Sequence, residues 1–448
     1  MSITPPVDKA AMFEPFNQDV IAAFMRNKRK IAANGATRQV QALLDDVGAA
    51  AFNLLPHPFL FPADDFDMLA RIARDLLSAQ NKIVRHLCRQ RSRADILEQF
   101  SLGEALAPYI DWEELEAGRR RVARVDILPL PEGYAVCELN FSAAVGGAEL
   151  FDCHRCFMQA AGWPAGERNR SPYANLRALY EDSIQSLGID RLVLLDWSSH
   201  AARGYASPEL ARRYLAGIAD DIPIEVHTEL TYPSKWLRDG GGKGILVHRN
   251  FVYDDMTVNI DKFQVIHRSG AKFSNGLEAE LLMNKIWLAL LCDEHFHPLL
   301  DEREIAAIRN HIPHTFRLDE STFADALARK DEWVFKLNAS YGGVDVLIGK
   351  DHPAEALADR LRKDGVTNWV CQAFLEVATI RHPFDDTFVA AEHKPVLGMY
   401  LHRDEASGMV IRSNRFSSVV NAGSGAGVHW AAVVTQAEKE AVLAALDG

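Results

Sequence analysis

Between residues 119 and 152, apolar positions follow a two-residue period on both sides of a turn. The first run includes Val122, Val125 and Ile127, and the second extends from Tyr134 to Leu139. The segment between the two runs is rich in Pro and Gly, which favour turns. This pattern predicts a β-hairpin with one apolar and one polar face.

The polar face of this hairpin carries candidate chemistry. Its side chains are Arg124, Asp126, Glu138 and Asn140. If Leu128 pairs with Tyr134, Arg124 lies opposite Glu138. Oxygen-bearing side chains beside an arginine suit a magnesium-bound phosphate, because Mg²⁺ prefers hard oxygen ligands and a guanidinium matches a phosphate bidentately. The alternative is a solvated face whose cross-strand charges pair weakly.

A helical period dominates residues 1–118. The clearest example begins at Asp64 and Asp65, after which apolar residues recur at helical spacing from Phe66 to Leu87. This spacing predicts an amphipathic helix that begins at capping aspartates. We expect this region to pack against the rest of the chain rather than to react.

From about residue 180 to 263 the pattern alternates between strands and helices. Buried strands are predicted at 192–197, 222–227 and 244–250. This βαβ spacing predicts a small parallel sheet. Arg249 ends the last of these strands, where α/β sheets bind ligands, and its alternative is a surface arginine.

The C-terminal half contains two lysines in positions that favour phosphate binding. The segment 277–292 predicts a helix in which Lys285 lies among apolar residues, a setting where lysine more often extends its ammonium to solvent. Lys336 ends a predicted strand and precedes a loop with Gly342 and Gly343. The N–H groups of such a loop can fold over phosphates, with the lysine as a point charge. The segment matches neither the Walker nor the Rossmann glycine pattern.

Two later strands complete the pattern. The apolar strand at 368–376 stops at a polar edge, where its backbone can offer donors and acceptors to a purine. The strand at 409–414 carries Arg412 and Asn414 and leads into a loop rich in Asn, Gly and Ser.

The composition narrows the class of protein only slightly. With 448 residues, of which 48% are hydrophobic and 25% charged, the chain has the composition of a soluble globular protein with two or three subdomains. A formal net charge of −12 argues against nucleic acid as the main partner. Residues 1–16 do not form a secretory signal, and the most apolar helix candidate is too short and too charged to span a bilayer. We therefore expect a cytoplasmic protein with no membrane partner.

The six cysteines are scattered along the chain, as is typical of buried thiols in a reducing compartment. Cys153 and Cys156 form a lone C-x-x-C without a second pair. We interpret this pair as packing at the start of a helix rather than as a zinc site.

Taken in order, these segments resemble the ATP-grasp ligases, specifically the eukaryotic-type glutathione synthetase and glutathionylspermidine synthetase branch. The shared motifs are R-x-D…E-x-N followed by a Gly-Gly turn, N-K-x-x-L-x-L-L, P-x-T, V-x-K-x-x-x-x-x-G-G, a hinge strand and R-S-x…N-x-G. Each motif is weak alone, but their order across residues 120–427 is specific. The resemblance implies an α+β chain with a circularly permuted, glutathione synthetase-like ATP-grasp fold, an N-terminal helical region and a small inserted α/β subdomain.

The patterns and the resemblance together predict four regions. They are an N-terminal helical region at 1–118, a metal- and phosphate-binding hairpin and helix at 119–180, a small α/β substrate-binding subdomain at 181–265, and a nucleotide-binding region with a glycine flap at 266–448.

The resemblance also implies roles for individual residues. One or two Mg²⁺ ions would be held by Asp126, Glu138 and Asn140. The substrate or the transferred phosphate would contact Arg124 and Arg412. The ATP phosphates would be bound by Lys285 and Lys336 beneath a flap that includes Ser340, Gly342 and Gly343. The adenine hinge would consist of Gln372, Ala373, Phe374 and Leu375, with a ribose contact at Glu392 or an adjacent residue. The remaining substrate contacts would be Ser142, Val145, Arg249 and Asn414.

Two departures from the family pattern separate this chain from glutathione synthetases. Those enzymes carry a metal-binding glutamate in the flap, at a place that falls near Ser340 or Tyr341 here. Their basic residue two positions after the strand arginine is Asn414 in this chain. Glutathione is therefore not implied as the product, and Asp126 would supply the missing metal charge.

The resemblance implies an ATP-dependent carboxylate-amine ligase that releases ADP and phosphate through an acyl phosphate. Its partners would be a small carboxylate, such as an amino acid or peptide, and an amine, and a homodimer is the default expectation. The alternatives are a kinase that releases a phosphorylated product and a non-catalytic ATP-binding protein.

Overall fold

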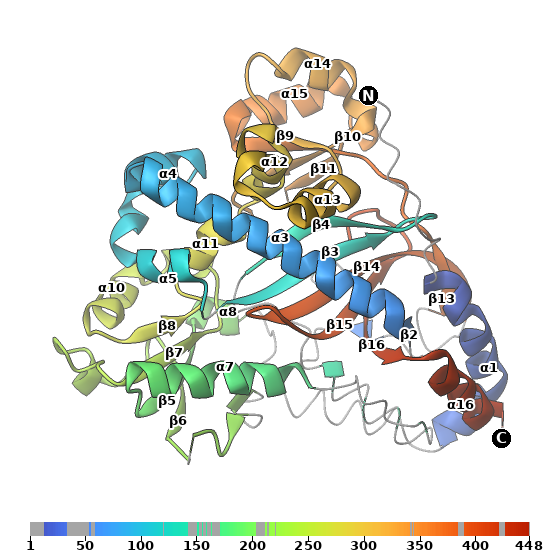
Figure 1. The fold of residues 1–448 in the computed structure, drawn as a ribbon, viewed down its shortest axis with the longest axis horizontal. Coiled ribbons are helices and arrows are strands. Elements are labelled where there is room, and N and C mark those ends of the chain that lie inside the picture. The colour runs from blue at the N-terminus through green and yellow to red at the C-terminus, as the bar shows by residue number, and fades with distance from the viewer. Residues whose placement is uncertain are drawn as a thin grey trace.

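The computed structural model describes most of the chain. The described residues are 13–33, 53–54, 59–119, 121–141, 150–151, 155, 158, 163, 171–202, 211–212, 215–219, 221–340, 343, 345–383, 389–420 and 426–447. They form three β-sheets with helices packed around them, a mixed arrangement of helices and sheets (Figure 1).

The largest sheet has eight strands and forms the centre of the molecule. Its strands are β1 (Asn53–Leu54), β2 (Phe59–Pro62), β3 (Val122–Pro129), β4 (Tyr134–Asn140), β13 (Ile380–Pro383), β14 (Ala390–His402), β15 (Glu405–Asn414) and β16 (Gly427–Val434). The order along the sheet is β1-β16-β15-β14-β3-β4, with β13 paired to β14 and β2 paired to β16. The pairs of β16 with β1 and β2 are parallel, and the others are antiparallel.

Two four-stranded sheets flank this centre. The first is antiparallel in the order β11-β10-β12-β9, with β9 (Thr315–Arg317), β10 (Trp333–Leu337), β11 (Val346–Ile348) and β12 (Trp369–Ala373). The second is parallel in the order β6-β5-β7-β8, with β5 (Arg191–Asp196), β6 (Ile224–Thr228), β7 (Ile245–Arg249) and β8 (Lys272–Ser274). The parallel sheet confirms the βαβ pattern predicted for this region.

Helices cover the sheets. The longer ones are α1 (Phe13–Ala33), α3 (Ala63–Gln90), α7 (Pro172–Leu187), α10 (Ile260–Arg268), α13 (Glu302–His311), α15 (Ala354–Lys363) and α16 (Gln436–Asp447). The shorter ones are α4 (Arg93–Gln99), α5 (Trp112–Ala117), α8 (Ser198–Ala201), α11 (Glu278–Leu282), α12 (Ile286–Cys292) and α14 (Phe323–Ala328). Short 3-10 helices are η1 (Glu104–Tyr109), η2 (Ser234–Trp236), η3 (Tyr253–Thr257), η4 (Glu294–Leu299), η5 (Lys330–Glu332), η6 (Gly349–Asp351) and η7 (Val366–Asn368).

The predicted amphipathic helix is α3, which runs across the large sheet (Figure 1). It begins at Ala63 after Pro62, so Asp64 and Asp65 lie in its first turn and do not cap it as predicted. It contacts β2, β15 and β16, and its apolar residues from Phe66 to Leu87 join the main hydrophobic core. Burial of this apolar stripe, at about 25 cal/mol per Å² of apolar surface, fixes the helix on the sheet.

The predicted hairpin is formed by β3 and β4, but its register differs from the expectation. Pro129, not Leu128, lies opposite Tyr134, and a bulge at Cys137 shifts the pairing again. Arg124 therefore lies opposite Asn140 rather than opposite Glu138. The bulge adds one residue to β4, which a strict two-residue period does not reveal.

The helix predicted over 277–292 is broken in two at Met283–Lys285. Asn284 causes the break: its Oδ1 accepts a hydrogen bond from Ile286 N at 3.1 Å, and its Nδ2 donates to Phe100 O at 2.7 Å. Asparagine side chains compete with helical hydrogen bonds in this way. Lys285 thus lies at the N-terminal end of α12 instead of inside one continuous helix.

Two strands, β2 and β16, were not among the elements predicted from the sequence. The apolar segment Phe59–Pro62 is β2, and all four of its residues are buried beside β16. β16 is itself buried at every position. Such continuous apolar runs lack the alternation of a half-buried strand, so their strand identity depends on the partners that cover both faces.

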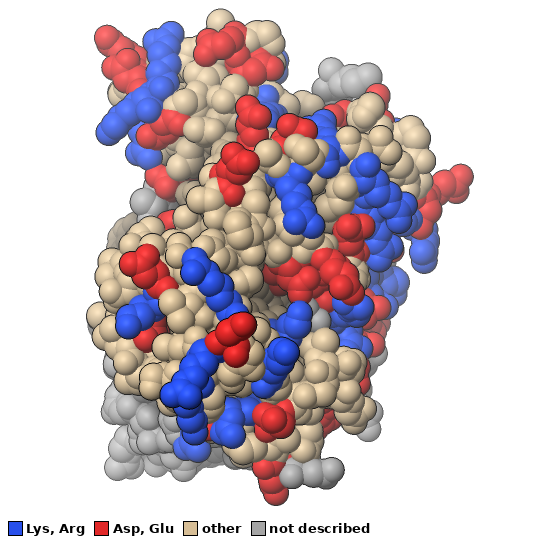
Figure 2. Space-filling view, turned by 90° about the vertical axis from the view of Figure 1, so that its left-hand side faces the viewer, with Lys and Arg blue, Asp and Glu red and all other residues tan. Residues whose placement is uncertain are grey.

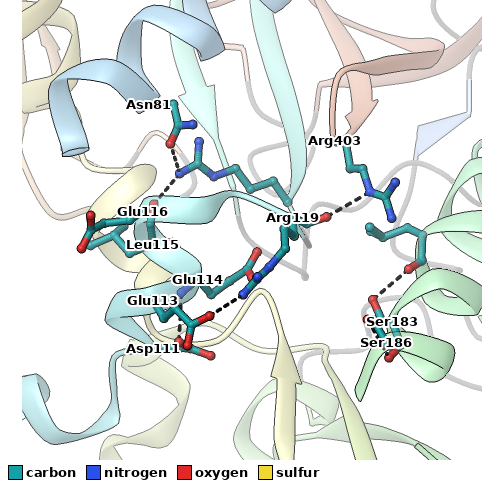
Figure 3. A network of polar contacts seen from close by, with 12 residues as sticks. Asn81, Asp111, Glu113, Glu114, Leu115, Glu116, Arg119, Ser183, Ser186 and Arg403 are labelled. Carbon is teal, nitrogen blue, oxygen red and sulfur yellow. Dashed lines mark hydrogen bonds and ion pairs between the residues drawn. The ribbon is translucent and has the colours of Figure 1, made fainter. Parts of the chain in front are cut away.

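A polar junction ties the helical region to the sheet at the start of β3 (Figure 3). Arg121 donates to Leu115 O at 2.7 Å and to Asn81 Oδ1 at 3.0 Å, and Arg119 pairs with Glu113 at 3.0 Å. Arg403, in the β14–β15 turn, donates to Arg119 O at 3.0 Å. These contacts fix the beginning of β3, the strand that carries Arg124 and Asp126. In the described part of the chain, no helix combines the length and the apolar character required to cross a membrane.

We predict that stability falls as the pH drops from about 6.5 to about 4, because burial keeps histidines neutral. Burial lowers the pKa of His393 and His429 from 6.5 to about 4, and the pKa of His402 to about 3. The unfolded chain binds more protons in this window, so each residue contributes up to about 1.4 kcal/mol per pH unit.

Urea unfolding between pH 4 and pH 7 will test this prediction. We expect His402→Gln to reduce the slope of unfolding free energy against pH. Equal slopes in the wild type and the variant would contradict the assignment.

Candidate active site

A cavity lies between the large sheet and the antiparallel sheet. It encloses about 1050 Å³, counted to its open mouth. β3, β4, β14 and β15 supply one wall, and β10, β11 and β12 supply the other. Three segments distant in sequence meet here: the hairpin, the start of α12 and the strand that ends near Lys336.

The charged lining of this cavity is more positive than negative. Its cations are Arg124, Lys285, Lys336, Lys394 and Arg412, and its carboxylates are Asp126, Glu138 and Glu376. The outer surface, by contrast, mixes both signs on the face shown in Figure 2. A chain with a formal net charge of −12 therefore contains a local site suited to an anion.

Lys285 connects the hairpin to the loop after β10. Its Nζ lies 3.1 Å from Glu138 Oε1 and donates to Ser340 O at 2.5 Å. The Lys285 side chain is almost completely buried, which excludes the snorkelling alternative for this residue. The break in the helix before α12 is what directs this lysine into the cavity.

Lys336 projects from β10 into the same cavity. Its Nζ donates to Cys137 O at 2.8 Å and to Gln372 Oε1 at 2.7 Å. Gln372 in turn donates to Thr315 Oγ1 at 3.1 Å. These contacts hold the ammonium with neutral oxygen acceptors rather than with a carboxylate.

Two arginines converge on Asp126. Arg124 donates from Nε to Oδ1 at 2.8 Å and from Nη2 to Oδ2 at 3.2 Å. Arg412 Nη2 lies 2.7 Å from Oδ2, and Asn140 Nδ2 donates to the same oxygen at 3.1 Å. Arg412 Nε is buried and has no hydrogen-bond partner among the described residues. We call Arg124, Asp126 and Arg412 the arginine clamp. The buried Nε–H of Arg412 can donate a hydrogen bond to an anion.

The pKa values of these groups reflect burial and neighbouring charge. Burial disfavours the ionised forms of Asp126 and Glu138, but the arginines lower the pKa of Asp126 below its usual value, and Lys285 does the same for Glu138. Burial lowers the pKa of Lys336, although Glu138 partly opposes this effect. The carboxylates are therefore ionised at neutral pH, while Lys336 holds its proton less tightly than an exposed lysine.

The oxygen donors suit magnesium only in part. Among the described residues, no three His, Cys, Asp or Glu side chains cluster as metal ligands. Glu138 and the Asn140 amide offer hard oxygens, whereas the Asp126 oxygens already accept from Arg124 and Asn140. A carboxylate has about four lone-pair sites, so Asp126 Oδ1 retains one for a cation.

Two backbone N–H groups of the predicted hinge are already paired with carbonyl groups. Ala373 N donates to His314 O and Phe374 N donates to Glu332 O, both at 2.8 Å. Among the described residues, no acceptor is paired with the N–H of Leu375. Leu375 lines the cavity. Its N–H is therefore the candidate hydrogen-bond donor to a base among the four predicted hinge residues.

Apolar side chains surround this end of the cavity. They come from β10, β11, the hinge and the large sheet, and include Val334, Val346, Ile348, Phe374, Leu128 and Val396. A slot with apolar faces and a backbone donor at its edge fits a planar heteroaromatic base.

Five of the described residues predicted as ligand contacts do not line the cavity: Ser340, Ala373, Arg249, Glu392 and Asn414. Arg249 is fully buried and donates to Glu280 Oε1 at 2.6 Å, to Asn275 O at 2.7 Å and to Gly276 O at 3.1 Å. A buried ion pair and two carbonyl contacts thus occupy the guanidinium, which argues against the predicted role of Arg249 as a substrate contact. Asn414 Oδ1 accepts from Phe416 N and Ser417 N, and Glu392 is exposed on β14.

Of the remaining predicted residues, two belong to the described part of the chain and three do not. Ala373 is buried in β12, and Gly343 lines the cavity. Ser142, Val145 and Gly342 lie outside the described residues, as do Tyr341, Cys153 and Cys156.

Sequence reasoning missed Lys394, Glu376 and Ser418, which all line the cavity. Lys394 shares a strand face with Val396, so the two-residue period of β14 would have placed it beside the apolar lining. Glu376 directly follows the predicted hinge, and its proximity along the chain was the available signal.

Comparisons with known proteins give a likeness of fold. No protein-family model matches the sequence, and no curated protein matches it. Among solved structures, a glutathione synthetase-like effector from Globodera pallida, solved in its apo form, has a TM-score of 0.56 and 14% sequence identity. The match covers 85% of this chain and 90% of the effector chain. The chain therefore has a glutathione synthetase-like fold over most of its length.

We predict that Arg249→Leu destabilises the protein, because it removes the guanidinium that pairs with the buried Glu280 carboxylate. Removing one member of such a pair costs about 3–5 kcal/mol. The double variant Arg249→Leu/Glu280→Leu removes both charges and should recover most of this loss. Urea unfolding measures both effects. A single variant as stable as the wild type would contradict the structural role of the pair.

Proposed function

We propose that this protein is an ATP-dependent carboxylate-amine ligase. The observation that supports the proposal best is the 3.1 Å contact between Lys285 Nζ and Glu138 Oε1, with Lys336 in the same cavity. Two ammonium groups beside a hard oxygen acceptor form a site for a polyphosphate and its cation. The glutathione synthetase-like fold is consistent with this chemistry, although fold alone does not establish it.

The nucleotide would lie along the cavity with its base in the apolar slot and its phosphates at the lysines. The N–H of Leu375 would donate to the base. Lys336, already close to Gln372 at the hinge side, would bind the phosphate nearer the sugar, and Lys285 the distal phosphates. The carbonyl of Ser340 holds Lys285 in place for this contact.

Magnesium would use the oxygen donors that remain. Glu138 and Asn140 would hold it, with the free lone pair of Asp126 Oδ1 as a further ligand. When bound, the ion would neutralise charge on the phosphates and favour transfer of the terminal phosphoryl group.

The reaction would proceed in two steps. A substrate carboxylate oxygen attacks the γ-phosphorus, forms a new P–O bond and breaks the bond to ADP. The nitrogen of a neutral amine then attacks the acyl carbon, phosphate leaves with the C–O electron pair, and the amine loses one proton to phosphate or solvent. The products are an amide, ADP and phosphate.

The arginine clamp would orient the carboxylate in the first step. Arg412 Nε points at no protein acceptor among the described residues, and Arg124 is held by Asp126. Both arginines would therefore donate hydrogen bonds to the substrate carboxylate while it receives the phosphoryl group. Removing one such preorganised donor typically costs about 2.7–4 kcal/mol of barrier.

A second candidate is a nucleotide-binding protein without ligase activity. Two observations favour it: the arginines occupy much of Asp126, and Ser340 or Tyr341 stands where the family has a flap glutamate. This candidate predicts ATP binding without substrate-dependent release of ADP.

We predict that Glu138→Ala lowers turnover by about 10²–10³-fold, because it removes an oxygen donor at the phosphates. ADP release is measured against a panel of amino acids, peptides and polyamines, with hydroxylamine present to trap an acyl phosphate as a hydroxamate. Glu320→Ala, at an exposed glutamate, is the matched control.

Several results would contradict the ligase assignment. Unchanged turnover in Glu138→Ala removes the proposed metal site. AMP as the nucleotide product excludes phosphoryl transfer to the carboxylate. ATP binding without ADP release across the panel favours the second candidate, and a stable phosphorylated product without amide indicates a kinase.

We predict that ATP binding is coupled to proton uptake at Lys336. The pKa of this lysine is lowered in the free protein, and a bound phosphate would raise it by favouring the ammonium. Affinity should fall as the pH rises through the free-state pKa, by up to about tenfold per pH unit. Calorimetry in buffers of different ionisation enthalpy measures the uptake. Lys336→Arg keeps the charge at all working pH values and should remove the dependence; the same dependence in this variant would contradict the prediction.

A further inference from the structure

Asp126 occupies the arginine clamp in the way that a bound anion would. Its Oδ1 accepts a hydrogen bond from Arg124 Nε at 2.8 Å. Its Oδ2 lies 3.2 Å from Arg124 Nη2 and 2.7 Å from Arg412 Nη2. Guanidinium groups bind the carboxylates and phosphates of ligands with the same donor geometry. The clamp therefore already contains an anion, and that anion belongs to the chain itself.

The two arginines reach Asp126 from different strands. Arg124 lies two residues before Asp126 on β3, whereas Arg412 lies on β15 and reaches across β14 to the same carboxylate. Gly398 of β14 pairs with Asp126, and a Cβ added to Gly398 would lie 2.7 Å from Arg124 Cδ and 3.1 Å from Arg124 Nε. The side chain of Arg124 thus lies against β14, in space that a glycine leaves open. Its position depends on β14 as well as on Asp126.

A ligand in the cavity can reach the same guanidinium groups. Arg124, Asp126 and Arg412 all line the cavity, although the side chains are only 13%, 3% and 10% exposed. Two guanidinium groups face one carboxylate in the clamp, so the clamp retains a positive charge. Arg412 Nε is buried and has no hydrogen-bond partner among the described residues. An oxyanion is therefore the ligand that the clamp would attract.

Exchange with Asp126 is more favourable than binding beside it. An anion added to the occupied clamp would place two like charges together at a buried site, which is costly. An anion that takes the place of Asp126 leaves the charge facing the arginines unchanged. Asn140, on the neighbouring strand β4, donates to Asp126 Oδ2 at 3.1 Å and offers the displaced carboxylate a donor outside the clamp.

We propose that Asp126 is an exchangeable counter-ion, which closes the arginine clamp in the free protein and is displaced by the oxyanion of a ligand. The inference rests on the proposed function, in which the clamp binds the substrate carboxylate, and it adds the resident anion with which that carboxylate competes. Asp126 thereby lowers the affinity of the clamp for small free anions. A ligand that makes further contacts in the cavity overcomes the competition, so the exchange selects substrates against isolated carboxylate or phosphate ions.

Calorimetric titration of the full-length protein with inorganic phosphate, and separately with acetate, tests the inference without nucleotide or divalent cations. We expect Asp126→Asn to bind at least one of these anions about tenfold more tightly than the wild type, because the arginine donors are released from a carboxylate. Glu376→Gln is the matched control, since it removes a carboxylate from the cavity lining without changing the clamp, and it should bind both anions as the wild type does. Asp126→Asn/Arg412→Met should lose the gain.

Each outcome supports or overturns the exchange. A gain for acetate identifies a carboxylate as the displacing group, and a gain for phosphate alone identifies a phosphate. Equal affinities in the wild type and Asp126→Asn overturn the inference. The same gain in Glu376→Gln shows a general effect of charge and overturns it, as does a gain that persists without Arg412.

A second measurement applies if Asp126→Asn does not fold in buffer alone. Refolding yields with and without phosphate or acetate are then compared. Recovery that requires one of the anions supports the exchange, and no recovery under either condition overturns it. The proposed function fails separately, because a wild type that binds no ATP overturns the nucleotide site, whereas the exchange is measured without nucleotide.

Discussion

The central constraint in this molecule is the burial of opposite charges between two sheets. Lys285, Lys336, Arg124 and Arg412 share a cavity with Asp126 and Glu138, and most of these side chains are nearly inaccessible to solvent. Buried charges are costly unless each finds a partner, so the hairpin, α12 and β10 must meet with little freedom. The remaining cationic excess is what an anionic ligand would neutralise.

The surrounding architecture keeps these charges in position. α3 supports the large sheet, the junction of Arg119, Arg121 and Arg403 fixes the start of β3, and the buried pair of Arg249 and Glu280 connects β7 to α11. None of these contacts lies in the cavity. They hold in place the strands and helices that carry the charged side chains of the cavity.

Much of the arrangement could be predicted from the sequence, because it depends on patterns among residues that lie close together along the chain. The apolar periods predicted α3, the hairpin and the parallel sheet, and the ordered motifs pointed to Glu138, Lys285 and Lys336. The failures depend on long-range partners. No periodic pattern in the sequence reveals the bulge at Cys137 or the buried pair of Arg249 and Glu280. The segments of β2 and β16 can be identified as strands only when the layers that cover them are known. Lys394 was overlooked because no motif marks it.

The side chain of Asn284 links the site to a distant part of the chain. Its amide donates to Phe100 O, just beyond α4, while its oxygen interrupts the helix in front of Lys285. The orientation of a candidate phosphate-binding ammonium is thereby set by a carbonyl from the N-terminal helical region. A displacement of α4 would therefore disturb the contact that positions Lys285, although α4 itself lies outside the cavity.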